Sequence, residues 1–144
     1  MVQKKCHLMF KKNIYNTIMK NGKKRVSEKI LLKVLKELQK TPKNSRNVFK
    51  LSVLNSSPVI FLKQIKRKRK KIKEFPFILN SKLRVSYGLK NLIKICRKEK
   101  KSFYKNLKTE VLNSSNKIGK SFNYKIETHQ KAFSKKKFSN YRWF

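Results

Sequence analysis

The sequence predicts a mainly α-helical protein, a bundle of about six helices with a protruding two-stranded antiparallel β-ribbon at about residues 58–80. Three observations predict this fold. Apolar residues recur at helical spacing along most of the 144-residue chain. Only three Gly and three Pro interrupt it, so long irregular loops are not expected. One internal stretch instead places β-branched and aromatic runs on both sides of a basic centre. The length and the 38% of hydrophobic residues fit a single domain, residues 1–144, with a modest core.

The first two predicted helices are bounded by end signals. Residues 8–20 carry apolar residues at a spacing of four, and Asn21-Gly22 follows as a helix C-terminal signal. Residues 26–40 carry an apolar stripe at i, i+1, i+4, i+5 and i+8. Ser27 near its start is a possible N-cap, and Thr41-Pro42 ends the segment. We therefore expect two amphipathic helices in this part of the chain.

Four further segments have helical spacing. Residues 45–56 are a shorter candidate, and residues 84–98 carry the clearest apolar stripe. Residues 102–117 repeat the pattern, with Gly119 as the stop signal. The last helix, at about 122–139, is more polar. The polar faces are rich in Lys, which is typical of an amphipathic bundle with a basic surface.

Residues 58–80 form the exception to helical spacing. Pro58 ends the preceding helix, and the run at 59–62 is β-branched and aromatic. A second apolar run surrounds Pro76 and indicates an edge strand, because proline cannot donate to the sheet ladder. The basic residues between the runs then occupy the outer half and tip of a hairpin. A helix through this basic centre is the alternative, since Lys and Arg favour helices; the flanking prolines and β-rich runs favour the hairpin.

The charge balance indicates a polyanionic partner. The chain has 41 Lys plus Arg against six acids, all of them Glu, for a net charge of +35. That charge far exceeds what solubility requires, and nucleic acid is the obvious partner that neutralises it. Lys outnumbers Arg by 34 to 7, a ratio that suits phosphate neutralisation better than bidentate base recognition. An AT-rich genome also favours Lys, Asn, Ile and Phe.

The sequence lacks the patterns of an enzyme or a cofactor protein. No nucleotide-binding, hydrolase or metalloprotease motif is present, and the six Glu form no adjacent pair for acid–base catalysis. Cys6 and His7 are too isolated for a metal site, so we expect no metal and no cofactor. Cys6 and Cys96 are expected to be free thiols in a reducing compartment. His129, on one side of the last helix, is expected to be structural or to face RNA. Neither a membrane span nor a signal peptide is expected.

Two classes of nucleic-acid-binding protein fit these observations. A general basic packaging protein is the alternative, but such chains usually lack this many helices with defined stops. A helical domain with a basic ribbon and a Tyr-Arg-Trp end fits RNA better, because aromatic and Arg side chains stack on exposed bases.

The end of the chain carries a specific resemblance. Residues 129–143, HQKAFSKKKFSNYRW, resemble the C-terminal signature of the bacterial-type family of small-subunit ribosomal protein seven. Residues 16–24, NTIMKNGKK, resemble the end of that family's first helix, and further matches bring the similarity to about residues 8–143. The matched positions of the terminal signature are His129, Lys136, Phe138, Ser139, Tyr141, Arg142 and Trp143. Other matched positions are Glu28, Ile30, Pro58, Pro76, Arg84, Arg97, Lys98, Leu107, Glu110 and Gly119.

The resemblance implies a structural constituent of the small ribosomal subunit. Such a protein binds the 3′ major domain of small-subunit rRNA, nucleates assembly of the head and lies near the exit-site tRNA and mRNA. Head proteins and the platform protein eleven are its implied neighbours. Two departures stand out: Lys68–Lys71 replace the usual Gly-Gly of the hairpin tip, and the basic N-terminal arm, residues 1–7, is short. Ending one residue after Tyr-Arg-Trp resembles organelle-encoded members, so we expect a mitochondrial ribosome, with a plastid one as the alternative.

We expect RNA contacts in three main regions: after the first helix, along the ribbon with the start of the next helix, and at the C-terminus. Phosphate clamping and shape complementarity, more than base recognition, are expected to provide affinity and specificity. The candidate residues are Lys4, Lys5, Lys23, Lys24, Arg25, Lys66, Arg67, Lys68, Arg69, Lys70, Lys71, Lys73, Lys82, Arg84, Arg97, Lys135, Lys136, Arg142 and Trp143.

Overall fold

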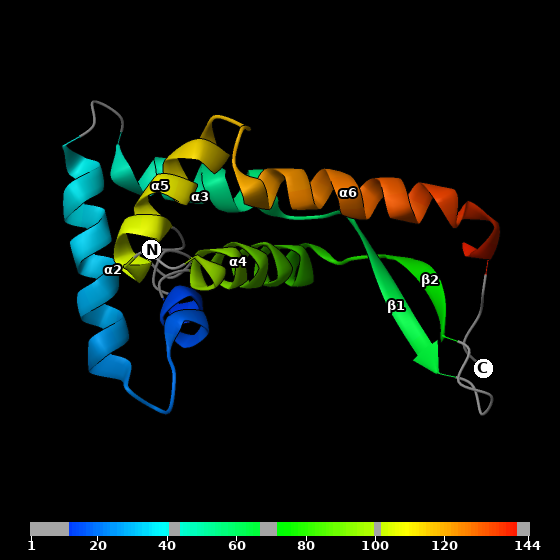
Figure 1. Ribbon diagram of the computed structural model, residues 1–144, viewed down its shortest axis with the longest axis horizontal. Helices are drawn as coiled ribbons and strands as arrows, with labels where there is room; N and C mark the ends of the chain where they lie inside the picture. Colours follow the sequence, from blue (N-terminus) through cyan, green and yellow to red (C-terminus); the bar gives the residue numbers. More distant parts are fainter. Residues whose placement is uncertain (1–11, 41–43, 67–71, 100–101, 141–144) are drawn as a thin grey trace, which may run out of the picture.

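The computed structural model describes residues 12–40, 44–66, 72–99 and 102–140. Residues 12–18 are helical, and the predicted helices that follow are all present. Figure 1 shows a helical body with α2 at one end and a two-stranded ribbon extending from the other. The elements are α2 (Lys24–Gln39), α3 (Ser45–Ser56), β1 (Ile60–Lys66), β2 (Ile72–Ile78), α4 (Ser81–Lys98), α5 (Phe103–Ser115), α6 (Lys120–Ser134) and a short 3-10 helix, η1 (Lys136–Phe138).

The core lies where residues 12–18 and helices α2 to α5 meet. Its members are the apolar stripes that the sequence predicts, and the most deeply buried side chains are almost inaccessible to solvent. Burial of each such Leu or Val contributes about 1.5–3 kcal/mol. The best-buried apolar residues are Leu31, Val34, Leu38, Val53, Leu89, Leu92, Leu107 and Val111. The apolar stripes therefore fix how the helices pack.

Two predicted helix-end signals are wrong and one is confirmed. Asn21 and Gly22 adopt φ values of 51° and 69°, so the turn after the first helix is left-handed as predicted. Ser27 does not cap α2: it is buried within the helix, and its hydroxyl donates to Lys24 O at 2.7 Å. Gly119 does not stop α5, which ends earlier, at Ser115; Gly119 is instead the N-cap residue of α6. Its position reflects a close tertiary contact, described below.

Two helix boundaries also differ from the prediction. Helix α4 begins at Ser81, directly after Asn80, rather than at residue 84. Asn and Ser both favour helix starts, a signal that the apolar stripe further along the helix obscured. Helix α6 ends at Ser134, and residues 136–138 form a separate 3-10 turn. The earlier start of α4 places Arg84 in that helix's first turn.

The β-ribbon is confirmed, and the helical alternative is excluded for both arms. Strands β1 and β2 pair antiparallel, with Ile60 opposite Ile78 and Leu62 opposite Pro76. Because a two-stranded ribbon consists only of edge strands, Pro76 is tolerated. The tip, residues 67–71, lies outside the described residues, as does the replacement of Gly-Gly at Lys68–Lys71.

Three contacts tie the ribbon to α6 and to the η1 turn that follows it; in Figure 1 the ribbon leaves the helical body near the middle of α6. The Val59 N–H at the ribbon base donates to His129 Nε2 at 3.0 Å. Further out, the rings of Phe75 and Phe138 pack edge to face at 5.6 Å. One residue nearer the tip along β2, Glu74 forms an ion pair with Lys135. Helix α6 and the segment that follows it therefore brace the base and the middle of the ribbon.

Candidate nucleic-acid interface

The described candidate residues fall at two ends of the molecule. The first group, Lys23, Lys24 and Arg25, is exposed at the turn into α2. The second lies on and beside the ribbon, where α6 and η1 bring the second and third predicted regions together (Figure 1). It comprises Lys66 at the end of β1, exposed Lys73, Lys82 and Lys136, and half-buried Arg84 and Lys135. Outside the described residues lie Lys4, Lys5, Arg67, Lys68, Arg69, Lys70, Lys71, Arg142 and Trp143.

The cations after the first helix are available to an anionic partner. The Lys24 ammonium lies 3.9 Å from a carboxylate oxygen of Glu28, and both side chains are exposed. An exposed pair of this kind contributes little to stability. This turn therefore presents positive charge to solvent without a strong internal partner for Lys24.

Arg97 has a structural role that its sequence position did not predict. Its Nη2 donates to the carbonyl oxygens of Thr17 at 3.2 Å and Ile18 at 2.8 Å. These carbonyls stand at the end of the helix at 12–18, so the guanidinium satisfies acceptors that the helix leaves open. Arg97 therefore joins α4 to the first helix; RNA binding by its exposed part stays a prediction.

Lys135 also has an internal partner. It pairs with Glu74 of β2, and Glu74 in turn accepts a hydrogen bond from Gln64 Nε2 of β1 at 2.8 Å. Part of the Lys135 charge is therefore used to hold α6 against the ribbon. Lys136 is exposed, so its positive charge is more available to an anionic partner than that of Lys135.

At the base of the ribbon, Arg84, Lys125 and His129 form a cluster that we call the ribbon-base cluster. The Nε of Arg84 is buried and has no hydrogen-bond partner among the described residues. Burial lowers the pKa of Lys125, and the charges of Arg84 and Lys117 lower it further. Burial also lowers the pKa of His129, with contributions from Lys125 and Arg84. Lys125 is not among the residues predicted from the sequence, although its i, i+4 spacing from His129 places both on one face of α6.

Most of the carboxylates, in contrast, form ion pairs within the fold. Four of the six Glu form ion pairs with Lys among the described residues. The pairs are Glu28–Lys24, Glu37–Lys108, Glu74–Lys135 and Glu99–Lys120. Few carboxylates are therefore left to neutralise the remaining cations, and the surface as a whole favours phosphate.

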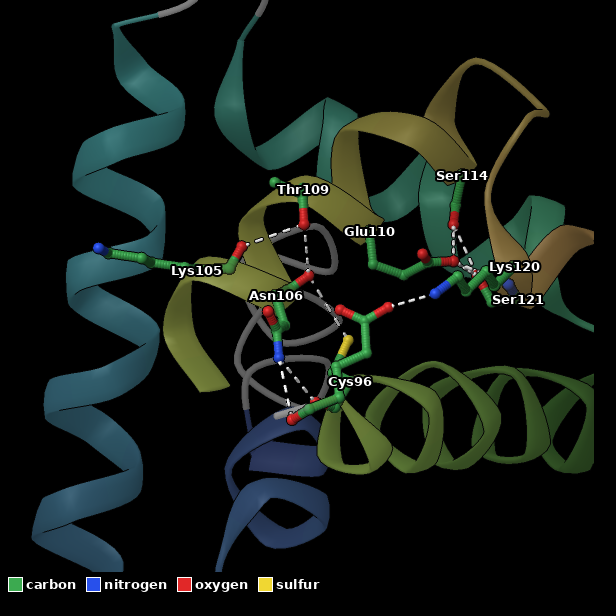
Figure 2. Close-up of polar contacts among 9 residues, drawn as sticks. Cys96, Lys105, Asn106, Thr109, Glu110, Ser114, Lys120 and Ser121 are labelled. Carbon is green, nitrogen blue, oxygen red and sulfur yellow. Dashed lines mark hydrogen bonds and ion pairs between the residues drawn. The ribbon is translucent and has the colours of Figure 1, made fainter. Parts of the chain in front are cut away.

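Glu110 is buried and anchors the start of α6, as Figure 2 shows. Its Oε1 accepts hydrogen bonds from the Ser121 N–H at 2.7 Å, the Ser121 hydroxyl at 2.7 Å and the Ser114 hydroxyl at 3.2 Å. A carboxylate at a helix N-terminus is stabilised by the free N–H groups and the helix dipole. A Cβ on Gly119 would lie 2.5 Å from Ser114 Oγ and 2.7 Å from Glu110 Oε1. Glycine at position 119 is therefore required by this close contact.

Cys96 lies beside this anchor and is buried (Figure 2). Burial raises its pKa from 9.0 to about 12, and the negative charges of Glu110 and Glu99 act in the same direction. Its Sγ lies 3.8 Å from Asn106 O. Within the described part of the chain, no group of three or more His, Cys, Asp or Glu is arranged to hold a metal ion. None of the described helices has the length and apolar character of a membrane span.

Comparison with known proteins gives a consistent result. A family model described as ribosomal protein S7p/S5e matches residues 3–136. The small ribosomal subunit protein uS7 of Thermodesulfovibrio yellowstonii is 32% identical over 134 residues, which cover 90% of this chain and 84% of the relative. The uS7 proteins of Mycoplasma mobile and Heliobacterium modesticaldum are 30% and 33% identical, covering 90% and 89% of this chain and 84% and 83% of the relatives.

Proposed function

The chain belongs to the ribosomal protein S7p/S5e family, and we propose that it binds the 3′ major domain of small-subunit rRNA and nucleates assembly of the head. As a member of this family it is a structural, rRNA-binding protein of the small ribosomal subunit and not an enzyme. Family membership also argues against the alternative function, that of a general basic nucleic-acid packaging protein.

This proposal rests on the excess of Lys and Arg side chains over the Glu side chains that could neutralise them. The chain has 41 Lys plus Arg and six Glu, and four of those Glu already pair with Lys within the described residues. The exposed cations at the start of α2 and along the ribbon lie at two ends of the molecule (Figure 1). Such an arrangement suits simultaneous contact with separate RNA segments, with specificity from shape.

The position of the ribbon supports a further role near the exit site. Lys73 is exposed on β2, and the basic tip sequence follows β1. The ribbon extends from one end of the helical body (Figure 1), and its contacts with α6 and η1 fasten it there. A braced basic ribbon of this kind is suited to approach the tRNA and mRNA that pass the exit site.

An apolar groove between the ribbon and α6 supports a protein neighbour. The groove has a volume of about 690 Å³ and is lined mainly by apolar side chains, among them Ile60, Pro76, Ile126 and Phe133. Phe133 is 77% exposed. Phosphate groups do not bind apolar surfaces, so this groove is suited to a neighbouring ribosomal protein, and we propose the platform protein eleven, with head proteins at other surfaces.

We also propose a mitochondrial ribosome as the location, with a plastid ribosome as the alternative. The relatives described above are bacterial. A composition rich in Lys, Asn, Ile and Phe, with 34 Lys to 7 Arg, fits an AT-rich gene, and organelle genes are commonly AT-rich. Mass spectrometry of small subunits sedimented from purified mitochondria and plastids tests this; detection in neither contradicts it.

Binding to a 3′ major domain rRNA fragment at several salt concentrations tests the main proposal. Replacing Lys23, Lys24 and Arg25 together by Gln should reduce the slope of log K against log salt by about two to three units, roughly 0.7–0.9 for each phosphate contact. A duplex DNA competitor of equal length at physiological salt should not displace the rRNA. Equal affinity for both nucleic acids would contradict a specific rRNA role.

A further inference from the structure

Helix α4 carries a buried cationic nitrogen that has no hydrogen-bond partner among the described residues. The Nε of Arg84 is the one buried side-chain nitrogen or oxygen in the described part of the chain that lacks a hydrogen bond. Buried polar groups in folded proteins are nearly always paired, and an exception calls for an explanation, such as a bound water or ion. Nearby Asn80 only fixes the Arg84 backbone, accepting its N–H at 2.9 Å.

Arg84 stands where three elements converge. The Val59 N–H donates to His129 Nε2 of α6 at 3.0 Å, and the Val59 carbonyl accepts the Leu79 N–H at 3.0 Å. Leu79 leads directly into α4, whose first turn carries Arg84. The start of β1, the middle of α6 and the first turn of α4 are therefore held together, and the positive end of the α4 dipole adds to the local charge.

The cluster contains cations and no acid that balances them. Lys125 and His129 lie one turn apart on α6; Arg84 and Lys117 act on Lys125, and Lys125 and Arg84 act on His129. Glu127 lies two positions from each of them and therefore on another face of the helix. Burial together with repulsion from these neighbouring cations lowers the pKa of both Lys125 and His129. A bound anion would relieve the repulsion.

The hydrogen bond to Val59 also fixes the histidine tautomer. Because Nε2 of His129 accepts the Val59 N–H, the neutral ring carries its proton on Nδ1. That Nδ1–H is a donor, as are the guanidinium of Arg84 and the ammonium of Lys125. A phosphate group, with several acceptor oxygens, matches a fork-shaped Arg, a Lys and a neutral imidazole donor.

We propose that Arg84, Lys125 and His129 form a binding site for one phosphate group of the rRNA backbone, at the base of the ribbon. This inference rests on the proposed rRNA-binding function and adds to it a defined contact that includes two residues outside the predicted set, Lys125 and His129. The bound phosphate compensates the Arg84 guanidinium and joins α4, α6 and the ribbon in the complex.

Binding of the rRNA fragment by the full chain tests the proposal. Arg84→Gln should weaken binding about tenfold and reduce the salt slope by about 0.7–0.9. The matched control is Arg46→Gln, which changes an exposed Arg in the first turn of α3. Lys125→Gln provides a second test if the Arg84 variant does not fold. If the wild type binds and both cluster variants behave like the control, the inference is wrong while the proposed function stands. If the wild type does not bind, the proposed function fails.

Titration of His129 by NMR tests the ligand directly. The chain has two His, so a His7→Gln variant leaves one signal to follow. Adding the rRNA fragment should raise the His129 titration midpoint, whereas an equal ionic strength of chloride should not. An unchanged midpoint with rRNA contradicts the proposal. A rise with inorganic phosphate but not with rRNA assigns the site to a free anion and also contradicts the RNA contact.

Discussion

Helix α6 passes a buried carboxylate and a half-buried cationic cluster, which differ in how their charge is compensated. At its start, the Glu110 carboxylate accepts three hydrogen bonds from Ser114 and Ser121. At its middle, Lys125 and His129 face Arg84, whose Nε has no partner among the described residues. The first charge is compensated by the fold alone. The positive charge of the second site is compensated only when an anionic partner binds. The first site therefore stabilises the free protein, and the second contributes to the complex.

Titratable groups near the two sites report opposite local potentials. Burial and the acids near the Glu110 anchor raise the pKa of Cys96 to about 12. Burial and the neighbouring cations of the ribbon-base cluster lower the pKa of His129. Burial favours the neutral form in both cases, and the neighbouring charges act in the same direction. The four predictions below test this contrast, from the largest expected effect to the smallest.

Removal of the anchor carboxylate should have the largest effect on stability. Glu110→Ala leaves the buried Ser121 N–H and two hydroxyls without their acceptor, which should reduce the free energy of unfolding by roughly 2–4 kcal/mol. Urea denaturation of the free protein measures this change. Glu110→Gln retains an acceptor oxygen and should lose less. Equal stability of the wild type and the Ala variant would show that Glu110 does not anchor α6.

A single added methyl group at the same site should have the next largest effect. In Gly119→Ala the new Cβ meets Ser114 Oγ and Glu110 Oε1, and such overpacking costs about 1–3 kcal/mol. Gly22→Ala is the matched control: its φ is +69°, but no atom lies within 4 Å of the added Cβ. It should lose only about 1 kcal/mol, from backbone strain. The order of the two midpoints in urea checks the contrast, and a reversed order contradicts it.

The ribbon-base cluster should make stability depend on pH. The pKa of His129 in the folded chain is lowered from 6.5, so the unfolded chain binds the proton more tightly. This contribution to stability is complete above pH 6.5 and is lost as the pH falls from there through the folded pKa. His129→Gln, in which the side-chain oxygen can still accept the Val59 N–H, should retain neutral-pH stability and lose this dependence. Thermal melts between pH 5 and 8, in a His7→Gln background, measure this pH dependence. If the melting temperature changes with pH equally with and without the His129→Gln substitution, His129 does not have this role.

Alkylation of Cys96 should be nearly undetectable in the folded protein. A thiol with a pKa of about 12 rather than 9.0 carries about a thousandfold less thiolate at pH 8. Iodoacetamide labelling followed by mass spectrometry, in a Cys6→Ser variant, should show reaction only after urea unfolding. Rapid labelling of the folded chain would contradict the burial and the negative potential around Cys96.

Sequence patterns predict the helices and the ribbon because apolar spacing is a local property. They do not predict which polar residue serves which tertiary contact. Ser27 near a helix start suggests a cap, yet it faces the interior and its hydroxyl binds Lys24 O. Gly119 suggests a helix stop, yet its role arises from the approach of Glu110, nine residues earlier. Arg97 is a plausible RNA contact, but its bonds to the carbonyls of residues 17 and 18 depend on how α4 meets the first helix. The candidate cations are therefore predictable as a class, and their individual roles are not.

The contacts of Val59 with His129, Glu74 with Lys135 and Phe75 with Phe138 also determine the mechanics of the ribbon. A hairpin attached only at its base bends like a free cantilever, whereas one also fastened to a neighbouring helix and to the turn that follows it is a braced beam. Its stiffness is set by the brace as well as by its own pairing.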